Sequence, residues 1–131
     1  MASRIKAIGA LRPRIQLDKT VQKPELVRQM ARASGLNEGT IDLSLKELRD
    51  VIIEYLRAGR SVKVEGLGTW TPNIGLDGAF DVQYRADSAM NAGLNMAGVF
   101  SGDILNRENI GKTGDELVEL WNELNPDDQV D

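Results

Sequence analysis

Between residues 23 and 59, apolar side chains recur at the spacing of two consecutive α-helices. The first predicted helix begins at Lys23-Pro24-Glu25, because proline suits the first turn and a carboxylate favours the positive helix end. It ends at Gly35, and Asn37 is a suitable N-cap for a second helix that ends at Gly59. The second helix has the most regular apolar stripe of the chain: Ile41, Leu45, Leu48, Ile52 and Leu56. The pattern predicts a helical hairpin whose apolar faces meet.

After Gly59 the apolar period changes from that of a helix to that of a strand. Alternating segments at 61–65, 69–71 and 79–85 predict an antiparallel three-stranded sheet, with turn residues at 66–68 and 72–78. Asp87 or Ser88 is expected to cap a short helix that ends near Leu94. Together these elements predict an α+β domain at residues 23–95.

Two shorter segments flank this domain. Residues 1–22 form a predicted extension, in which Pro13 blocks a continuous helix and 14–18 alternate as a short edge strand. Residues 96–131 form a predicted tail, with one short strand within 99–104 and one helix at 115–124 that Thr113 caps. The apolar stripe of this last helix consists of Leu117, Leu120, Trp121 and Leu124.

The net charge of −4 conceals a strong asymmetry between the two ends of the chain. Residues 1–23 carry a charge of +5, whereas residues 96–131 carry −7. A local basic patch attracts phosphate groups whatever the net charge of the protein. The basic extension is therefore either a phosphate-binding segment or a solvated arm.

The residue types that are absent narrow the possible chemistry. The chain has no cysteine and no histidine, which excludes thiolate and imidazole zinc sites as well as Ser-His and Cys-His nucleophiles. The sequence around Lys112 lacks the first glycine of a phosphate-binding loop, and Gly66-x-Gly68 lacks the third glycine of a dinucleotide fingerprint. Three aspartates on a turn, a strand and a cap are assigned surface roles rather than a metal site: Asp77, Asp81 and Asp87. We expect no catalysis, no cofactor and no metal.

Other features bear on location and on the two tryptophans. No apolar run approaches the roughly 18 residues of a membrane span, and the N-terminus lacks the apolar segment of a secretory signal. With the absence of cysteine, these features favour the cytoplasm and give no reason to expect a membrane. Trp70 and Trp121 lie on apolar faces of their predicted elements, which favours core packing over stacking on nucleic-acid bases.

The residues from Gly59 to Trp70 read Gly-Arg-Ser-Val-Lys-Val-Glu-Gly-Leu-Gly-Thr-Trp and directly follow the helix pair. This order resembles the bacterial HU and integration host factor family, whose members carry a comparable helix, glycine, strand and Gly-Phe-Gly-Thr-Phe passage. The similarity runs without a gap from Lys23 to Trp70 and includes the family's first helix and turn at 27–36. The resemblance implies an intertwined homodimer with helices below, a saddle-shaped sheet above and two β-arms that wrap DNA in the minor groove.

The sequence adds a physical reason to expect a dimer. One helix pair and three short strands are too few to close a core without a partner. The residues assigned to the dimer core are Leu45, Leu48, Ile52, Val62, Val64 and Trp70.

The chain departs from the family pattern at the arm. The segment between Trp70 and Tyr84 is about fifteen residues shorter than the family pattern implies, and residues 71–78 contain no lysine or arginine. A lysine that the family usually has near its last helix is replaced by Ser88. We therefore expect a truncated arm that does not bend DNA.

A second resemblance concerns the flanking segments. The basic extension, the short arm and the passage from Asn106 to Trp121 look like a lesser-known HU-like group, whose members often carry a C-terminal immunoglobulin-like domain. Too few residues follow Asn95 for a sandwich of roughly 100 residues, so the tail is expected to be a remnant or a minimal substitute.

These considerations lead to a functional expectation with one alternative. We expect a dimeric, nucleoid-type protein that binds duplex DNA weakly and without sequence preference; the alternative is an HU-derived interaction module that no longer binds DNA. The residues assigned to DNA contact are Arg4, Lys6, Arg12, Arg14, Lys23, Arg60 and Lys63, with the backbone of Gly66 and Gly68. The acidic helix of the tail is expected to dock on the domain and face the basic extension, as a competitor of DNA or a surface for another protein.

Overall fold

A computed structural model describes residues 1–131, which fall into two compact units. The central unit consists of residues 20–100, and the terminal unit consists of residues 1–19 together with residues 101–131. The two ends of the chain, which the sequence pattern treats as separate segments, therefore belong to one unit.

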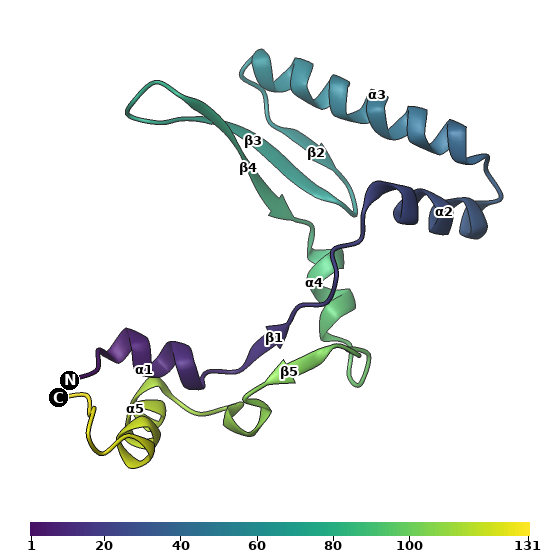
Figure 1. Ribbon diagram of the computed structural model, residues 1–131. Coiled ribbons are helices and arrows are strands. Elements are labelled where there is room, and N and C mark those ends of the chain that lie inside the picture. Colours follow the sequence, from purple (N-terminus) through teal and green to yellow (C-terminus); the bar gives the residue numbers. More distant parts are fainter. The chain divides into compact units, whose positions relative to one another are not determined.

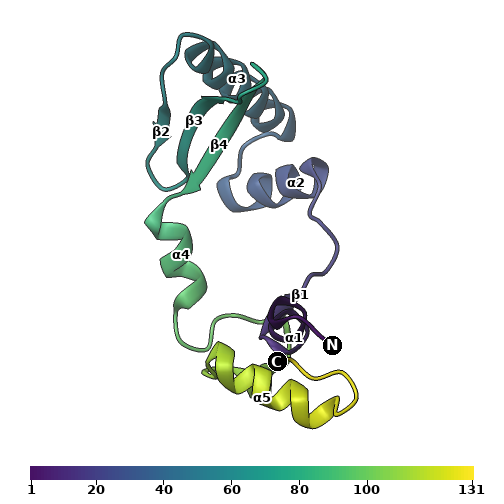
Figure 2. The same cartoon turned by 90° about the vertical axis from the view of Figure 1, so that its left-hand side faces the viewer.

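The central unit contains the predicted helical hairpin, the three-stranded sheet and the short helix. Its elements in chain order are α2 (Lys23–Ser34), α3 (Glu38–Arg57), β2 (Val62–Val64), β3 (Gly68–Ile74), β4 (Phe80–Ala86) and α4 (Ser88–Asn95). The predicted caps are present: Gly35 ends α2 in the left-handed conformation (φ 73°), and the Asn37 side chain accepts the Gly39 amide. Figures 1 and 2 show α3 lying along one face of the sheet.

The sheet has the order β2-β3-β4 and is antiparallel throughout. Its register aligns Val62, Trp70 and Tyr84 in one row and Lys63, Thr69 and Arg85 in the next. Because residues in successive rows point to opposite faces, the first row belongs to the apolar face beside α3 and the second belongs to the polar face.

The β3–β4 hairpin is short. The two strands pair from Gly68 opposite Ala86 to Ile74 opposite Phe80, and the chain then reverses over residues 75–79. The Gly75 amide donates to the Ala79 carbonyl at 2.8 Å, and the Asp77 carboxylate accepts the Ala79 amide at 3.0 Å. These bonds close the hairpin directly after the seventh pair of residues.

The terminal unit consists of five short elements from the two chain ends. They are α1 (Arg4–Leu11), β1 (Arg14–Gln16), β5 (Asp103–Leu105), the 3₁₀ helix η1 (Arg107–Asn109) and α5 (Gly114–Leu124). Thr113 caps α5 as predicted, with its hydroxyl accepting the Glu116 amide. β1 lies within the predicted strand, whereas β5 begins later than the strand expected at 99–104. Helix α1 has no counterpart among the predicted elements.

The two helices and the two strands of the terminal unit pair with each other. β1 and β5 form an antiparallel ladder, and α1 packs on α5, as Figure 1 shows. Ala7 of α1 is fully buried, and Leu117 of α5 is only 4% exposed. We expected the last helix to dock on the domain at residues 23–95, but in the structure α5 packs on α1. Beside this contact, the Ala2 amide donates to the Gln129 carbonyl at 3.2 Å.

Candidate nucleic-acid interface

The polar face of the central sheet carries one cation on each side of a threonine. Lys63 on β2 and Arg85 on β4 lie in the same row as Thr69 on β3. Both cations are exposed and neither forms an ion pair. Two strand spacings separate their backbones by roughly 10 Å, which is short enough for both long side chains to reach one phosphate backbone. The sequence did not assign Arg85 to the site, because only the register shows that it shares a row with Lys63.

Arg60 stands immediately before β2. Its guanidinium lies 5.2 Å from the centre of the Tyr55 ring, a separation at which a cation and an aromatic ring attract each other. The side chain is therefore held near the end of α3 while remaining exposed.

Lys23 is engaged within the central unit. Its ammonium lies 2.8 Å from the Asp42 carboxylate, which also pairs with Lys46 at 3.0 Å. Hydrogen bonds from Lys23 and then from Lys46 hold the pKa of Asp42 below its ordinary value. Lys23 links the first turn of α2 to α3, and a contact with phosphate would have to compete with Asp42.

The two glycines assigned to DNA contact lie at the turn between β2 and β3. The Gly66 amide donates to the Asp87 carboxylate at 3.2 Å, so this N–H already has a partner. Gly68 is buried, and a Cβ at this position would meet the Arg85 carbonyl and lie 2.7 Å from Cε1 of the Tyr84 ring. Gly68 is therefore needed for the close packing of β3 and β4.

Asp87 connects this turn to the short helix that follows the sheet. Its carboxylate accepts the Ala89 amide at 2.8 Å as the N-cap of α4 and the Gly66 amide from the turn. These two bonds, in this order of importance, lower the pKa of Asp87, and the charge of Lys63 adds to the effect.

The four cations assigned to the N-terminal extension separate into two pairs, all within the terminal unit. Arg4 lies 2.8 Å from the Asp115 carboxylate, and Lys6 lies 3.2 Å from that of Asp128 and 5.5 Å from the centre of the Trp121 ring. Arg12 and Arg14 are exposed and form no ion pair. The assigned residues thus form two sets, one in each unit.

The residues assigned to the dimer core lie at the apolar face of the central unit. Ile52 is 8% exposed, and the others are half-buried within the single chain: Leu45, Leu48, Val62, Val64 and Trp70. The Trp70 and Tyr84 rings, whose centres are 5.2 Å apart, cover part of this face.

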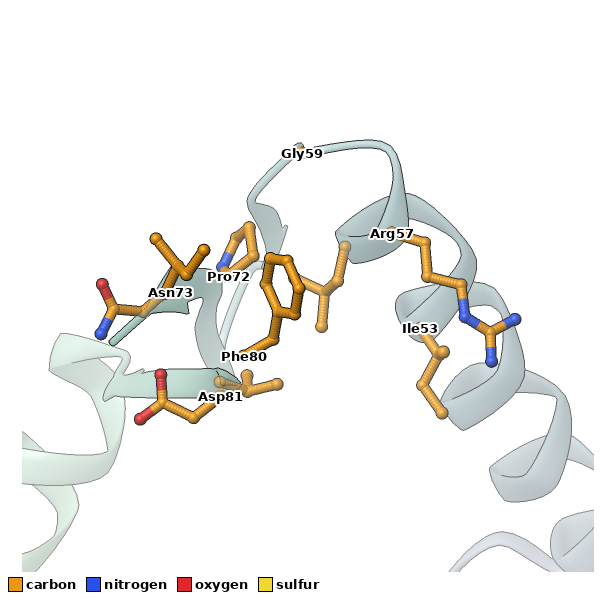
Figure 3. Close-up of a pocket in the computed structure, with 10 residues that line it drawn as sticks. Ile53, Arg57, Gly59, Pro72, Asn73, Phe80 and Asp81 are labelled. Atoms are coloured by element: carbon orange, nitrogen blue, oxygen red, sulfur yellow. The ribbon is translucent and has the colours of Figure 1, made fainter. Parts of the chain in front are cut away.

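An apolar groove of about 610 Å³ continues this face between the end of α3 and the tip of the hairpin. Ile53 and Leu56 line it from the helix, and Pro72, Ile74 and Phe80 line it from the strands. Figure 3 shows Phe80 and Ile53 on opposite sides of the hollow. The Phe80 side chain is 81% exposed, which is unusual for a large apolar residue and leaves the groove uncovered in the single chain.

The structure contains no group of three or more acidic side chains arranged to hold a metal ion. None of its helices combines the length and the apolar character needed to cross a membrane.

Residues 6–91 match the HU-HIG family, described as an HU domain fused to wHTH, Ig, or glycine-rich motif. Among solved structures, a variant of HU from Thermotoga maritima is similar, with 19% identity and a TM-score of 0.48 over 55% of this chain and 96% of that chain. No curated protein matches.

Proposed function

Because the chain belongs to the HU-HIG family, we propose that it is an architectural, nucleoid-type protein that binds duplex DNA as a homodimer and without sequence preference. The observation that carries this proposal is the row formed by Lys63, Thr69 and Arg85 on the exposed polar face of the sheet. Contacts between such cations and phosphate oxygens supply affinity that does not depend on base sequence. No catalytic step is part of the proposal.

In the proposed dimer, the second copy of the chain buries the apolar face that is exposed in the single chain. Phe80, Val82 and Ile74 are each more than half exposed in the single chain, and all three line the groove beside α3. Burying such side chains contributes roughly 1.5–3 kcal/mol for each one that becomes fully covered. A second copy of the chain is the occupant that the family relationship supports.

The short hairpin favours contact with DNA phosphates over insertion of the hairpin tip between base pairs. β3 and β4 are closed by the turn at residues 75–79, and residues 71–80 contain no lysine or arginine. Proteins that kink DNA through the minor groove insert apolar wedges and flank them with basic side chains. We propose that this chain engages phosphates from the sheet face and does not insert its hairpin tip.

One observation favours the alternative of an interaction module without DNA binding. Two of the four cations assigned to the extension, Arg4 and Lys6, are already paired with acids of the tail. This pairing lowers the positive potential that the extension offers to DNA.

A salt titration of duplex-DNA binding by the full chain tests the proposal. Measurable binding at about 50 mM salt, with a linear fall of log affinity against log salt, is expected. The variant Lys63→Gln/Arg85→Gln is expected to reduce the slope by about two units for each protomer in contact with DNA.

The control variant Arg28→Gln/Arg32→Gln removes the same charge from the exposed surface of α2. It is expected to keep most of the slope. Absence of binding by the unmodified chain at low salt would decide for the interaction module.

A further inference from the structure

The β1–β5 ladder of the terminal unit brings three arginines from distant parts of the sequence together. Arg14 lies opposite Leu105, and the ladder runs antiparallel. Arg12 and Arg107 each lie two residues beyond the last pair of the ladder, which is formed by Arg14 and Leu105. All three arginines therefore lie at or just beyond the same end of the ladder.

Hydrogen bonds from one side chain fix this end of the ladder. The Asn106 amide group donates to the carbonyls of Ala10 and Arg12, at 2.9 and 3.0 Å. Asn106 adopts a left-handed conformation (φ 57°), and Arg107 follows it as the first residue of η1. The backbones that carry Arg12 and Arg107 are thus held next to the same asparagine, so their proximity does not depend on the strands alone.

The three arginines differ from Arg4 and Lys6 in their electrostatic surroundings. Arg4 and Lys6 are paired with Asp115 and Asp128, whereas Arg12, Arg14 and Arg107 are exposed and form no ion pair.

Two acids are neighbours of these arginines, one through the strand register and one as the next residue in the sequence. Asp103 lies opposite Gln16, which is two residues from Arg14 along β1 and on the same face of the ladder. Glu108 follows Arg107 in η1. Neither is ion-paired with an arginine. Three of the five cations of the terminal unit that form no ion pair therefore lie at this end of the ladder.

We propose that Arg12, Arg14 and Arg107 form a second phosphate-binding surface, which contacts the backbone of duplex DNA independently of the sheet face of the central unit. Guanidinium groups suit this role because their planar N–H donors match phosphate oxygens in pairs and remain charged at all physiological pH values. Duplex DNA offers a negative charge about every 1.7 Å along its axis, so neighbouring guanidinium groups meet more than one phosphate. This inference rests on the proposed DNA binding and adds to it a surface that includes a residue of the acidic tail.

Paired variants of the full chain test this surface. Arg14→Gln/Arg107→Gln removes two of the three guanidinium groups while keeping most of each exposed side chain, so the fold is expected to remain intact, as circular dichroism and thermal unfolding will check. The log–log salt slope for a duplex of fixed length is expected to fall by about two units for each protomer in contact. The charge-matched control is again Arg28→Gln/Arg32→Gln, which lies on α2 of the central unit.

The outcomes separate this inference from the proposed function. If the unmodified chain binds DNA and the Arg14/Arg107 variant keeps its slope, the second surface is excluded and the proposed function stands. If this variant and the control lose the same slope, net charge alone accounts for the effect and the second surface is likewise excluded. If the unmodified chain does not bind DNA at low salt, both proposals fail together.

Discussion

The carboxylate of Asp87 accepts the backbone N–H of Gly66 across the base of the sheet, at 3.2 Å. The same carboxylate caps α4 through the Ala89 amide at 2.8 Å. One side chain thus joins the glycine turn between β2 and β3 to the helix that follows β4. Because this turn directly follows the strand that carries Lys63, Asp87 stabilises the part of the sheet proposed to meet DNA.

This connection predicts a dependence of stability on pH. Hydrogen bonds from Ala89 and Gly66 lower the pKa of Asp87, so the folded chain favours the ionised form more than the unfolded chain does. The resulting stabilisation is complete above the unfolded pKa, about 3.9, and is lost as the pH falls through the lower folded pKa.

Chemical denaturation of the unmodified chain and of Asp87→Asn, measured from about pH 6 to about pH 2, tests this dependence. The variant keeps a good N-cap and is expected to show a smaller loss of stability in acid. Equal acid sensitivity of both proteins would show that other carboxylates dominate.

Gly68 is predicted to be intolerant of any side chain. A Cβ would meet the Arg85 carbonyl and the Tyr84 ring, and the φ of 149° adds strain for any L-residue. We expect Gly68→Ala to lower the free energy of unfolding by about 1–3 kcal/mol. Gly93→Ala is the control, because this position is helical and a Cβ added there would have no neighbouring atom within 4 Å. We expect this change to raise the free energy of unfolding by about 0.5–1 kcal/mol. A similar effect of both changes would contradict the packing described for β3 and β4.

Asn109 is predicted to hold the terminal unit together. It is 2% exposed, donates to the Leu11 carbonyl at 2.7 Å and accepts from the Lys112 ammonium at 2.9 Å. Replacing it by alanine leaves the Leu11 carbonyl without this partner and is expected to cost about 1–3 kcal/mol. Hydrogen exchange is the suitable measurement, and amides of α1 and α5 are expected to exchange faster while those of α3 keep their protection. Uniform loss across the chain would show that the two units do not unfold separately.

Phe80 is predicted to act in the dimer rather than in the single chain. Its side chain is 81% exposed, so Phe80→Ser changes few contacts within one copy. We expect the variant to dissociate at concentrations at which the unmodified chain is dimeric, as sedimentation equilibrium will measure. Leu76→Ser is a matched control, since Leu76 is also highly exposed but does not line the groove. An unchanged dimer constant for Phe80→Ser would place the interface elsewhere.

The ion pairs between α1 and the tail predict that the acids of the tail weaken DNA binding by the basic extension. The variant Asp115→Asn/Asp128→Asn removes the partners of Arg4 and Lys6 while keeping the tail in place. We expect higher DNA affinity at low salt and a salt slope steeper by up to about two units for each protomer. Glu119→Gln/Glu123→Gln, which removes two acids of α5 that form no ion pair, controls for net charge. Equal gains in both variants would show that the specific pairs have no part in the effect.

The local signals in the sequence were sufficient for most of the central unit and for α5. Asn37 and Thr113 cap the helices that they were expected to cap, because capping depends only on a side chain and the next few amides. The alternation of residues 79–85 likewise predicts β4, and the register follows from a hairpin that joins neighbouring strands.

The terminal unit was not predictable in the same way. Helix α1 has only eight residues, and Ala7 is its one buried side chain, so its apolar pattern is weak. Helices of this length are not stable alone, and α1 is covered by α5, which lies more than a hundred residues away in the sequence. The assignment of Arg4 and Lys6 to DNA contact relied on local charge, which carries no information about such a distant acidic partner.

Because the terminal unit is built from both ends of the chain, it can fold only late during synthesis. Residues 1–19 leave the ribosome before residues 101–131, which contain the strand and the helix that complete their fold. The central unit, whose residues are contiguous, has all of its own chain available earlier. Residues 1–19 therefore acquire their structure only after residues 101–131 have been made, and until then Arg4 and Lys6 lack the acids with which they pair.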